Sequence, residues 1–202
     1  MTLAALVPHT QAPLHGAGEP SDWVRRWSHL AKPRGRLLDI ACGYGRHMAW
    51  FATLGCETMG IDRSAEAIAV AGQYGTCLQA DIENGPWPLM QAGVPQPFDV
   101  VVVTNYLWRS LLPTIVQSVA PGGLLLYETF ACGNETVGKP SRPDFLLQPA
   151  ELLQTCQGLH VVAYENGFLP QPERFVQRIA AMAPTIDPGE NREPVRHPLS
   201  LK

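Results

Sequence analysis

The sequence predicts an α/β fold, with helices on both faces of a single doubly wound sheet of about seven strands. The first observation is that short apolar runs alternate with helical patterns along most of the chain, which is typical of parallel strands joined by helices. The second is that two apolar runs near the end follow each other with no helical pattern between them. They predict a final antiparallel hairpin strand on a mostly parallel sheet.

Each strand is predicted at a run of apolar or β-branched residues that ends at a turn signal. Four consecutive valines make residues 98–104 the clearest of these runs. The residues between the last two runs, 169–173, are too few for a crossover helix, so these two strands form the predicted hairpin. The predicted strands cover residues 36–41, 57–62, 76–81, 98–104, 124–130, 159–164 and 174–180.

Helices are predicted from capping residues and from the helical spacing of apolar side chains. Ser21 is a good N-cap, and Trp23 and Trp27 then fall on one side of a helix that ends before Pro33. Ser64 caps another helix in the same way. Further helices are predicted from about residue 46 to 55, over 110–120 and around 151–153, with loops over 86–97 and 131–148.

The length of 202 residues suits one domain with two terminal extensions. Residues 1–19 contain prolines and glycines without sustained periodicity, and we expect a loose N-terminal arm. Residues 184–202 combine prolines and mixed charges with little apolar pattern, which predicts a mobile C-terminal tail. The predicted domain covers residues 20–183.

Charge and composition exclude several classes of protein. A net charge of −3 and a pI near 6.0 argue against nucleic-acid binding. No apolar stretch approaches the roughly 18 residues that cross a bilayer, and no Lys or Arg precedes Arg25, whereas a secretory signal starts with such residues. The five cysteines lack C-x-x-C spacing, and no His or Glu cluster has metal-ligand spacing. We therefore expect a cytoplasmic protein with reduced thiols, no metal, and no nucleic-acid or membrane partner.

Polar or small residues follow four predicted strands, at the edge where an open α/β sheet binds its ligand. The glycines of residues 43–45 let a ligand approach the backbone. Asp62 can accept hydrogen bonds from both ribose hydroxyls, although an ordinary helix cap is the alternative. Asp81 can bond an adenine amino group while Ile82 packs on the ring, and residues 104–106 follow the fourth strand. Together these groups favour a nucleoside-containing cofactor.

These groups resemble the motif series of class I S-adenosylmethionine-dependent methyltransferases, over roughly residues 21–182. The segments that carry the resemblance are Asp39-x-Ala41-Cys42-Gly43-x-Gly45-Arg46, Asp62, Asp81-Ile82, Phe98-Asp99-Val100-Val101 and Pro121-Gly122-Gly123-Leu124. Within that class, Tyr127-Glu128-Thr129-Phe130, Gly138-Lys139-Pro140 and Phe145-Leu146-Leu147 are similar to small bacterial enzymes of the tellurite-resistance type. The resemblance implies a Rossmann-like sheet and direct in-line transfer of a methyl group from S-adenosylmethionine to a small-molecule acceptor.

The resemblance also implies roles for individual residues. Asp39 would hold the methionine amino group, Asp62 the ribose, and Asp81 the adenine. Ala41 stands where the family usually has its first glycine, which tightens the turn. The implied cofactor-binding residues are Asp39, Ala41, Cys42, Gly43, Tyr44, Gly45, Arg46, His47, Asp62, Arg63, Asp81, Ile82, Thr104, Asn105 and Tyr106.

Two other functions are compatible with these motifs. A nicotinamide-dependent oxidoreductase also uses a glycine turn and a ribose acid, but Met48 stands where its third glycine belongs. The Asp39 carboxylate would also lie beside a pyrophosphate, which is electrostatically unfavourable. A cofactor-binding module without catalysis would have the same motifs. We expect a monomer or a homodimer.

The acceptor site is less clearly marked in the sequence. Trp23, Arg109 and Tyr127 are candidate acceptor contacts, and no catalytic residue is identified because no convincing general base is present. Residues 131–148 form a long loop of the kind that is often functional, and we expect them to close over the site together with residues 15–27.

Overall fold

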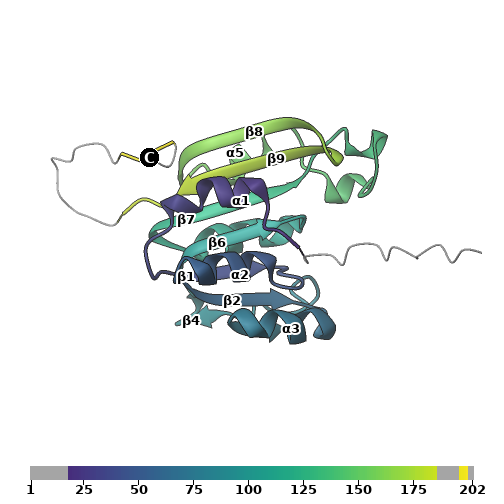
Figure 1. The fold of residues 1–202 in the computed structure, drawn as a ribbon. Helices are drawn as coiled ribbons and strands as arrows, with labels where there is room; N and C mark the ends of the chain where they lie inside the picture. Colours follow the sequence, from purple (N-terminus) through teal and green to yellow (C-terminus); the bar gives the residue numbers. More distant parts are fainter. Residues whose placement is uncertain (1–17, 186–195, 200–202) are drawn as a thin grey trace, which may run out of the picture.

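The computed structural model, which describes residues 18–185 and 196–199, contains a seven-stranded sheet in the order β3-β2-β1-β6-β7-β9-β8 (Figure 1). The first five of these strands run parallel, whereas β9 pairs antiparallel with both β7 and β8. This arrangement confirms the predicted fold class, including the reversed hairpin strand. The strands are β1 (Arg36–Ile40), β2 (Glu57–Asp62), β3 (Thr76–Gln79), β6 (Phe98–Thr104), β7 (Val119–Phe130), β8 (His160–Pro170) and β9 (Glu173–Met182).

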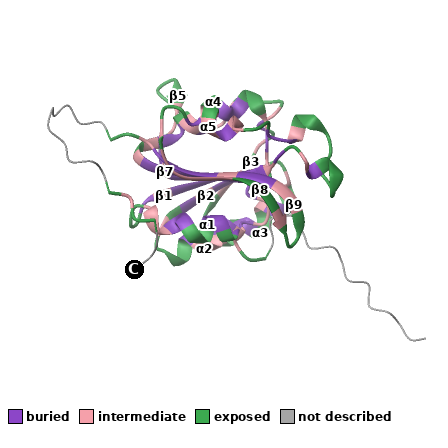
Figure 2. Ribbon diagram, turned by 90° about the horizontal axis from the view of Figure 1, so that it is seen from above, coloured by how far each residue is buried: buried purple, intermediate pink, exposed green. Residues whose placement is uncertain are grey.

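Helices cover both faces of the sheet, with α1, α2 and α3 on one face and α4 and α5 on the other (Figure 2). Ser21 caps α1 as predicted, and its hydroxyl accepts hydrogen bonds from the backbone of Trp23 and Val24. The helices are α1 (Asp22–Trp27), α2 (Arg46–Thr53), α3 (Ala65–Ala71), α4 (Leu112–Gln117) and α5 (Glu151–Thr155). Short 3-10 turns are η1 (Ser28–Leu30), η2 (Gly72–Tyr74), η3 (Arg109–Leu111), η4 (Asn134–Thr136) and η5 (Pro143–Phe145).

The valine run of β6 lies at the centre of the sheet and is buried on both faces. Val101 and Val103 pack in the cluster under α4 and α5, whereas Val100 and Val102 pack in the cluster under α1 and α2. Burial of each such side chain contributes about 1.5–3 kcal/mol. The two clusters hold the carboxyl ends of the parallel strands in a fixed arrangement at one edge.

Several segments differ from the sequence prediction. Strand β8 runs on to Pro170 instead of ending at residue 164. The predicted loop over 86–97 contains a small hairpin of β4 (Met90–Gln91) and β5 (Val94–Pro95). Ala92 and Gly93, which join its strands, both have positive φ, and such turns match the twist of paired strands. Strand β7 begins at Val119 rather than at residue 124, and β3 ends at Gln79 because Asp81 forms the following turn.

The predicted loop over residues 131–148 is folded against the sheet. Asn134, which is buried, donates from Nδ2 to the carbonyl of Pro140 at 2.9 Å, and its Oδ1 accepts the N–H of Phe175 in β9 at 3.1 Å. A parallel bridge joins Ala131 to Leu147. The loop therefore has its own internal hydrogen bonds and a fixed attachment to β9.

The C-terminal extension, residues 184–202, was predicted to be mobile, and residues 184–185 and 196–199 of it are described. The His197 ring lies against His160 with centroids 5.1 Å apart, and the carbonyl of Pro198 lies 2.9 Å from Nε2 of His29. Residues 196–199 thus pack on the domain, at the end of the sheet opposite the predicted site. The predicted arm falls mainly on residues 1–17, outside the described residues. Among the described helices, none is long and apolar enough to cross a membrane.

Candidate active site

The turn between β1 and α2 brings its backbone to the carboxyl edge of the sheet. Ala41 and Gly43 have φ values of 55° and 54°, and Gly45 has 80°. A Cβ atom at Gly45 would come within 2.9 Å of the Cβ of Ala71 in α3, so this glycine is required for helix packing. Ala41 adopts a conformation that costs an L-residue about 1–2 kcal/mol. The turn is thus strained where a glycine was expected.

Asp62 stands at the end of β2 and faces this turn. Its carboxylate accepts the N–H of Gly43 at 2.9 Å and the N–H of Ser64 at 2.8 Å. The first bond joins the two predicted motifs, and the second belongs to the start of α3. Asp62 therefore has a structural role, while each of its oxygens keeps a further lone pair for a ligand.

A first cavity opens beside Asp62, between the ends of β1, β2 and β3. It lies between the side chains predicted to bind ribose and adenine. Its lining residues are Ala41, Asp62, Arg63, Ala80, Asp81, Ile82, Glu83 and Tyr106. The structure thus brings six predicted cofactor residues together at one cavity: Ala41, Asp62, Arg63, Asp81, Ile82 and Tyr106.

Asp81 is held in a turn of its own. Its carboxylate accepts hydrogen bonds from the Asn84 side chain and from the backbone N–H groups of Glu83 and Asn84. The Asn84 side chain and then the Glu83 N–H lower the pKa of Asp81. A carboxylate that stays ionised can accept a bond from an adenine amino group.

A second cavity lies on the other side of the turn. Its lining residues are Ala41, Cys42, Gly43, Arg46, His47, Asp62, Thr104 and Asn105. Arg46 reaches across it, with one long contact of 3.5 Å from Nη2 to the hydroxyl of Thr104. Burial and then the Asp39 charge raise the pKa of Cys42, so this thiol keeps its proton and is a poor nucleophile.

Asp39 lies behind this cavity, buried in β1, and its Oδ2 has no hydrogen-bond partner. Nδ1 of His47 lies 3.7 Å from this oxygen, beyond hydrogen-bonding distance. Buried carboxylates are normally paired, and an unpaired one is expensive. Together with the Arg46 guanidinium, Asp39 makes a site of opposite charges that suits the ammonium and carboxylate of an amino acid.

Not every predicted cofactor residue lines a cavity. The hydroxyl of Tyr44 donates to Glu66 of α3 at 3.0 Å, so its side chain is turned toward that helix. Asn105, which does line a cavity, follows β6 directly and has a positive φ of 53°. It borders both the second cavity and a further one. Burial, with the charges of Glu83 and Asp81, raises the pKa of Tyr106, which keeps its proton.

A third cavity, of about 370 Å³, adjoins the other two, since it includes Glu83, Asn105 and Tyr106. Its walls are mostly apolar, and three of its lining residues, Lys139, Pro140 and Phe145, come from the loop over residues 131–148. The remaining lining residues are Leu107, Thr129, Phe130, Lys139, Pro140 and Phe145. None of these six was predicted as a site residue, although the length of the loop indicated that this segment lies near the acceptor.

The three predicted acceptor contacts do not line this cavity. Trp23 is 1% exposed and donates from Nε1 to the carbonyl of Ile179 at 3.1 Å. Tyr127 is fully buried and donates its hydroxyl to the carbonyl of Tyr106 at 2.9 Å. Both are core residues, because the sheet is covered on both faces at these positions, and their prediction as acceptor contacts is corrected here.

Arg109 has a structural role. Its guanidinium binds both carboxylate oxygens of Glu151, at 2.8 and 3.0 Å, and the carbonyls of Asp144 and Leu146. These bonds use most of its donors. Arg109 therefore fixes the end of the loop that lines the third cavity. It also lines a separate cavity with Trp108 and Phe145, and its direct contact with an acceptor stays a prediction.

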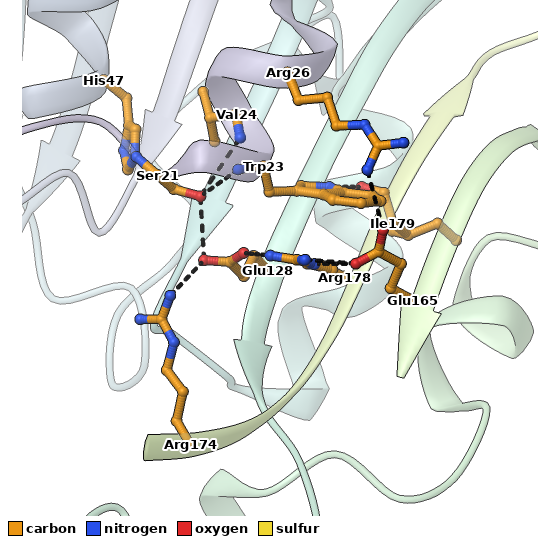
Figure 3. Close-up of polar contacts among 10 residues, drawn as sticks. All are labelled: Ser21, Trp23, Val24, Arg26, His47, Glu128, Glu165, Arg174, Arg178 and Ile179. Carbon is orange, nitrogen blue, oxygen red and sulfur yellow. Dashed lines mark hydrogen bonds and ion pairs between the residues drawn. The ribbon is translucent and has the colours of Figure 1, made fainter. Parts of the chain in front are cut away.

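A polar network fastens the N-terminal helix to the hairpin beside the second cavity (Figure 3). Glu128 of β7 is buried, accepts the Ser21 hydroxyl at 3.1 Å, and pairs with Arg178 at 3.3 Å. Arg174 lies 3.8 Å from the same carboxylate. Glu128 belonged to one of the motifs that carried the resemblance, but the sequence did not show its partners, which come from two other segments, the start of α1 and strand β9.

The chain matches the family model described as a methyltransferase domain, over residues 14–161. Since this match covers more than half of the chain, the chain belongs to the methyltransferase domain family. The predicted family is confirmed.

Relatives and solved structures agree with this class. The chain is 30% identical over 115 residues to a ubiquinone biosynthesis O-methyltransferase of Burkholderia thailandensis, covering 54% of this chain and 49% of the relative. It spans about half the length of the curated relatives it matches. Among solved structures, it is similar to TehB from Haemophilus influenzae (20% identity, TM-score 0.58, covering 74% and 57% of the two chains). It is also similar to a SAM-dependent methyltransferase from Methanosarcina mazei (14% identity, TM-score 0.62, 83% and 100%). These two similarities show a common fold.

Proposed function

We propose that this protein transfers the methyl group of S-adenosylmethionine to a small organic acceptor. The observation that carries the proposal is the buried Asp39 carboxylate, whose Oδ2 lacks a partner beside a cavity that also contains Arg46. A buried carboxylate oxygen without a hydrogen-bond partner can accept one from an ammonium group of a ligand. The ammonium group of the methionine moiety supplies one.

The remaining residues fit the same cofactor. Arg46 would pair with the carboxylate of the methionine moiety. Burial lowers the pKa of Arg46, but its guanidinium is still charged at neutral pH. Asp62 accepts from the ribose hydroxyls with its free lone pairs. Asp81 and Ile82 contact the adenine in the first cavity. Bound in this way, the cofactor supplies a methyl group already activated on a sulfonium.

The third cavity supports an organic acceptor. It has a volume of about 370 Å³ and apolar walls that include Phe130 and Phe145. Such a cavity suits an organic molecule with an apolar skeleton better than a hydrated ion. It meets the cofactor cavities at Asn105 and Tyr106, so the chain can align donor and acceptor and exclude water between them. Lys139 at this wall could face an anionic group on the acceptor.

Titration calorimetry of the purified protein tests the cofactor. We expect binding of S-adenosylmethionine and of its demethylated product, and no binding of NAD. Asp39→Asn should weaken the binding of S-adenosylmethionine and of its demethylated product, because it removes the negative charge that would pair with their ammonium group. Binding of NAD without binding of S-adenosylmethionine would overturn the proposal. Formation of the demethylated product with a panel of small phenols, thiols and carboxylic acids then separates an enzyme from a binding module.

A further inference from the structure

The N-terminal helix α1 is connected to the Asp39 carboxylate through one histidine. His47 is almost completely buried, and its Nε2 lies 3.3 Å from the backbone nitrogen of Ser21. A backbone N–H can only donate, so Nε2 must be the nitrogen without a proton. In the neutral ring the proton therefore lies on Nδ1, the nitrogen that faces Oδ2 of Asp39 at 3.7 Å.

Ser21 can make this contact because of its place in the chain. It is the N-cap of α1, so its own N–H has no partner inside the helix. Its hydroxyl accepts the N–H groups of Trp23 and Val24 and donates to Glu128. One residue thus fixes the helix start, the Glu128 carboxylate and the His47 ring at the same time (Figure 3).

The position of Ser21 is set by the hairpin rather than by the turn. Trp23 bonds to the carbonyl of Ile179 in β9, and its ring lies under the guanidinium of Arg178, 4.9 Å from the ring centroid. Arg178 in turn pairs with Glu128 and with Glu165 of β8. The last two strands therefore hold α1, and α1 holds His47.

We propose that Ser21 is a positioning residue for the cofactor site, through which α1 and the hairpin set the tautomer of His47 and the orientation of Asp39. This inference rests on the proposed function. A histidine with its proton on Nδ1 turns an N–H toward Asp39, 3.7 Å away, and so helps to fix the orientation of the carboxylate. A ring with its proton on Nε2 would turn a lone pair toward the carboxylate and repel it.

Two substitutions at Ser21 separate its hydroxyl from its N–H. Ser21→Ala removes the hydroxyl only. Ser21→Pro removes the hydroxyl and the N–H, and its ring tolerates the φ of −54° found here. We expect S-adenosylmethionine to bind about 3- to 10-fold more weakly to the Pro variant than to the Ala variant, the value of one hydrogen bond. Equal affinity of the two variants would overturn the inference.

Two substitutions at His47 test the same inference without changing the sequence of α1. An asparagine amide can replace Nδ1 and donate to Asp39, whereas a glutamine amide reaches toward Ser21 and leaves Asp39 alone. We therefore expect His47→Asn to bind the cofactor more tightly than His47→Gln does. The reverse order would overturn the inference.

The His47 tautomer, measured by ¹⁵N NMR in the full-length protein without ligand, is independent of the cofactor. We expect the Nδ1–H tautomer in the wild type and in Ser21→Ala, and loss of it in Ser21→Pro. An Nε2–H tautomer in the wild type would overturn the inference whether or not the cofactor binds. An Nδ1–H tautomer in a protein that binds no S-adenosylmethionine would instead overturn the proposed function.

Discussion

The glycine turn between β1 and α2 and the loop over residues 131–148 border the same edge of the sheet, but different interactions hold them. The turn is held mainly by its own backbone conformation and by Asp62 at the end of the next strand. The loop is held by side chains from distant parts of the chain, Arg109 from η3 and Asn134 bonded to β9. The turn is therefore held mainly by contacts close in sequence, whereas the loop on the acceptor side is held by contacts between distant parts of the chain.

The largest effect is expected from a substitution in the turn. Gly43→Val places a β-branched side chain at a φ of 54° and beside the cofactor, so we expect loss of measurable S-adenosylmethionine binding. Gly55→Val is the matched control. Gly55 also has positive φ, at 81°, but nothing lies within 4 Å of an added Cβ there. It should lose stability and keep its cofactor affinity. If both variants bind equally well, Gly43 is only a turn residue.

An intermediate effect is expected from releasing the loop. Arg109→Met removes the bonds to Glu151 and to two loop carbonyls, so the third cavity loses a fixed wall. With an acceptor identified by turnover, we expect its KM to rise about 10-fold, which corresponds to about 1.4 kcal/mol, while cofactor affinity is unchanged. Arg142→Met, which breaks an exposed ion pair with Asp144 in the same loop, should change KM little. A parallel loss of cofactor affinity in Arg109→Met would contradict the separation of the two sides.

The smallest effect is expected at Ala41. Ala41→Gly relieves a left-handed backbone conformation but makes the unfolded chain more flexible, which offsets part of the gain. We expect thermal or denaturant unfolding to show a stabilisation of about 0.5–1 kcal/mol. Because the backbone path of the turn is kept, cofactor affinity should stay the same. Destabilisation would show that the Ala41 methyl group contributes packing that exceeds the strain.

The lid predicted over residues 131–148 and 15–27 stays a prediction. The structure makes it sharper, because the loop is already bonded to β9 through Asn134 and lines a cavity with Lys139 and Phe145. Hydrogen exchange in this loop is the measurement that decides it, with slowing by the demethylated product as the expected result.

Much of the fold could be predicted because its signals are local. The valines of β6, the Ser21 and Ser64 caps and the glycine turn each act within a few residues of their own position. The β4–β5 hairpin was missed because its strands are two residues long and carry no periodic pattern. Trp23 and Tyr127 were predicted as acceptor contacts but are buried in the core, because a sequence does not show whether an aromatic side chain faces the core or a cavity.

The sequence by itself determined the parallel sheet, its reversed end and the strand-end acids Asp39, Asp62 and Asp81, because hydrophobic periodicity and turn chemistry act locally. Only the tertiary structure decided which partners these acids have. It left Oδ2 of Asp39 without a hydrogen bond, joined Asp62 to Gly43 and brought Ser21 to His47 and Glu128. Such contacts join segments up to 107 residues apart, and their geometry depends on the packing of every element between them.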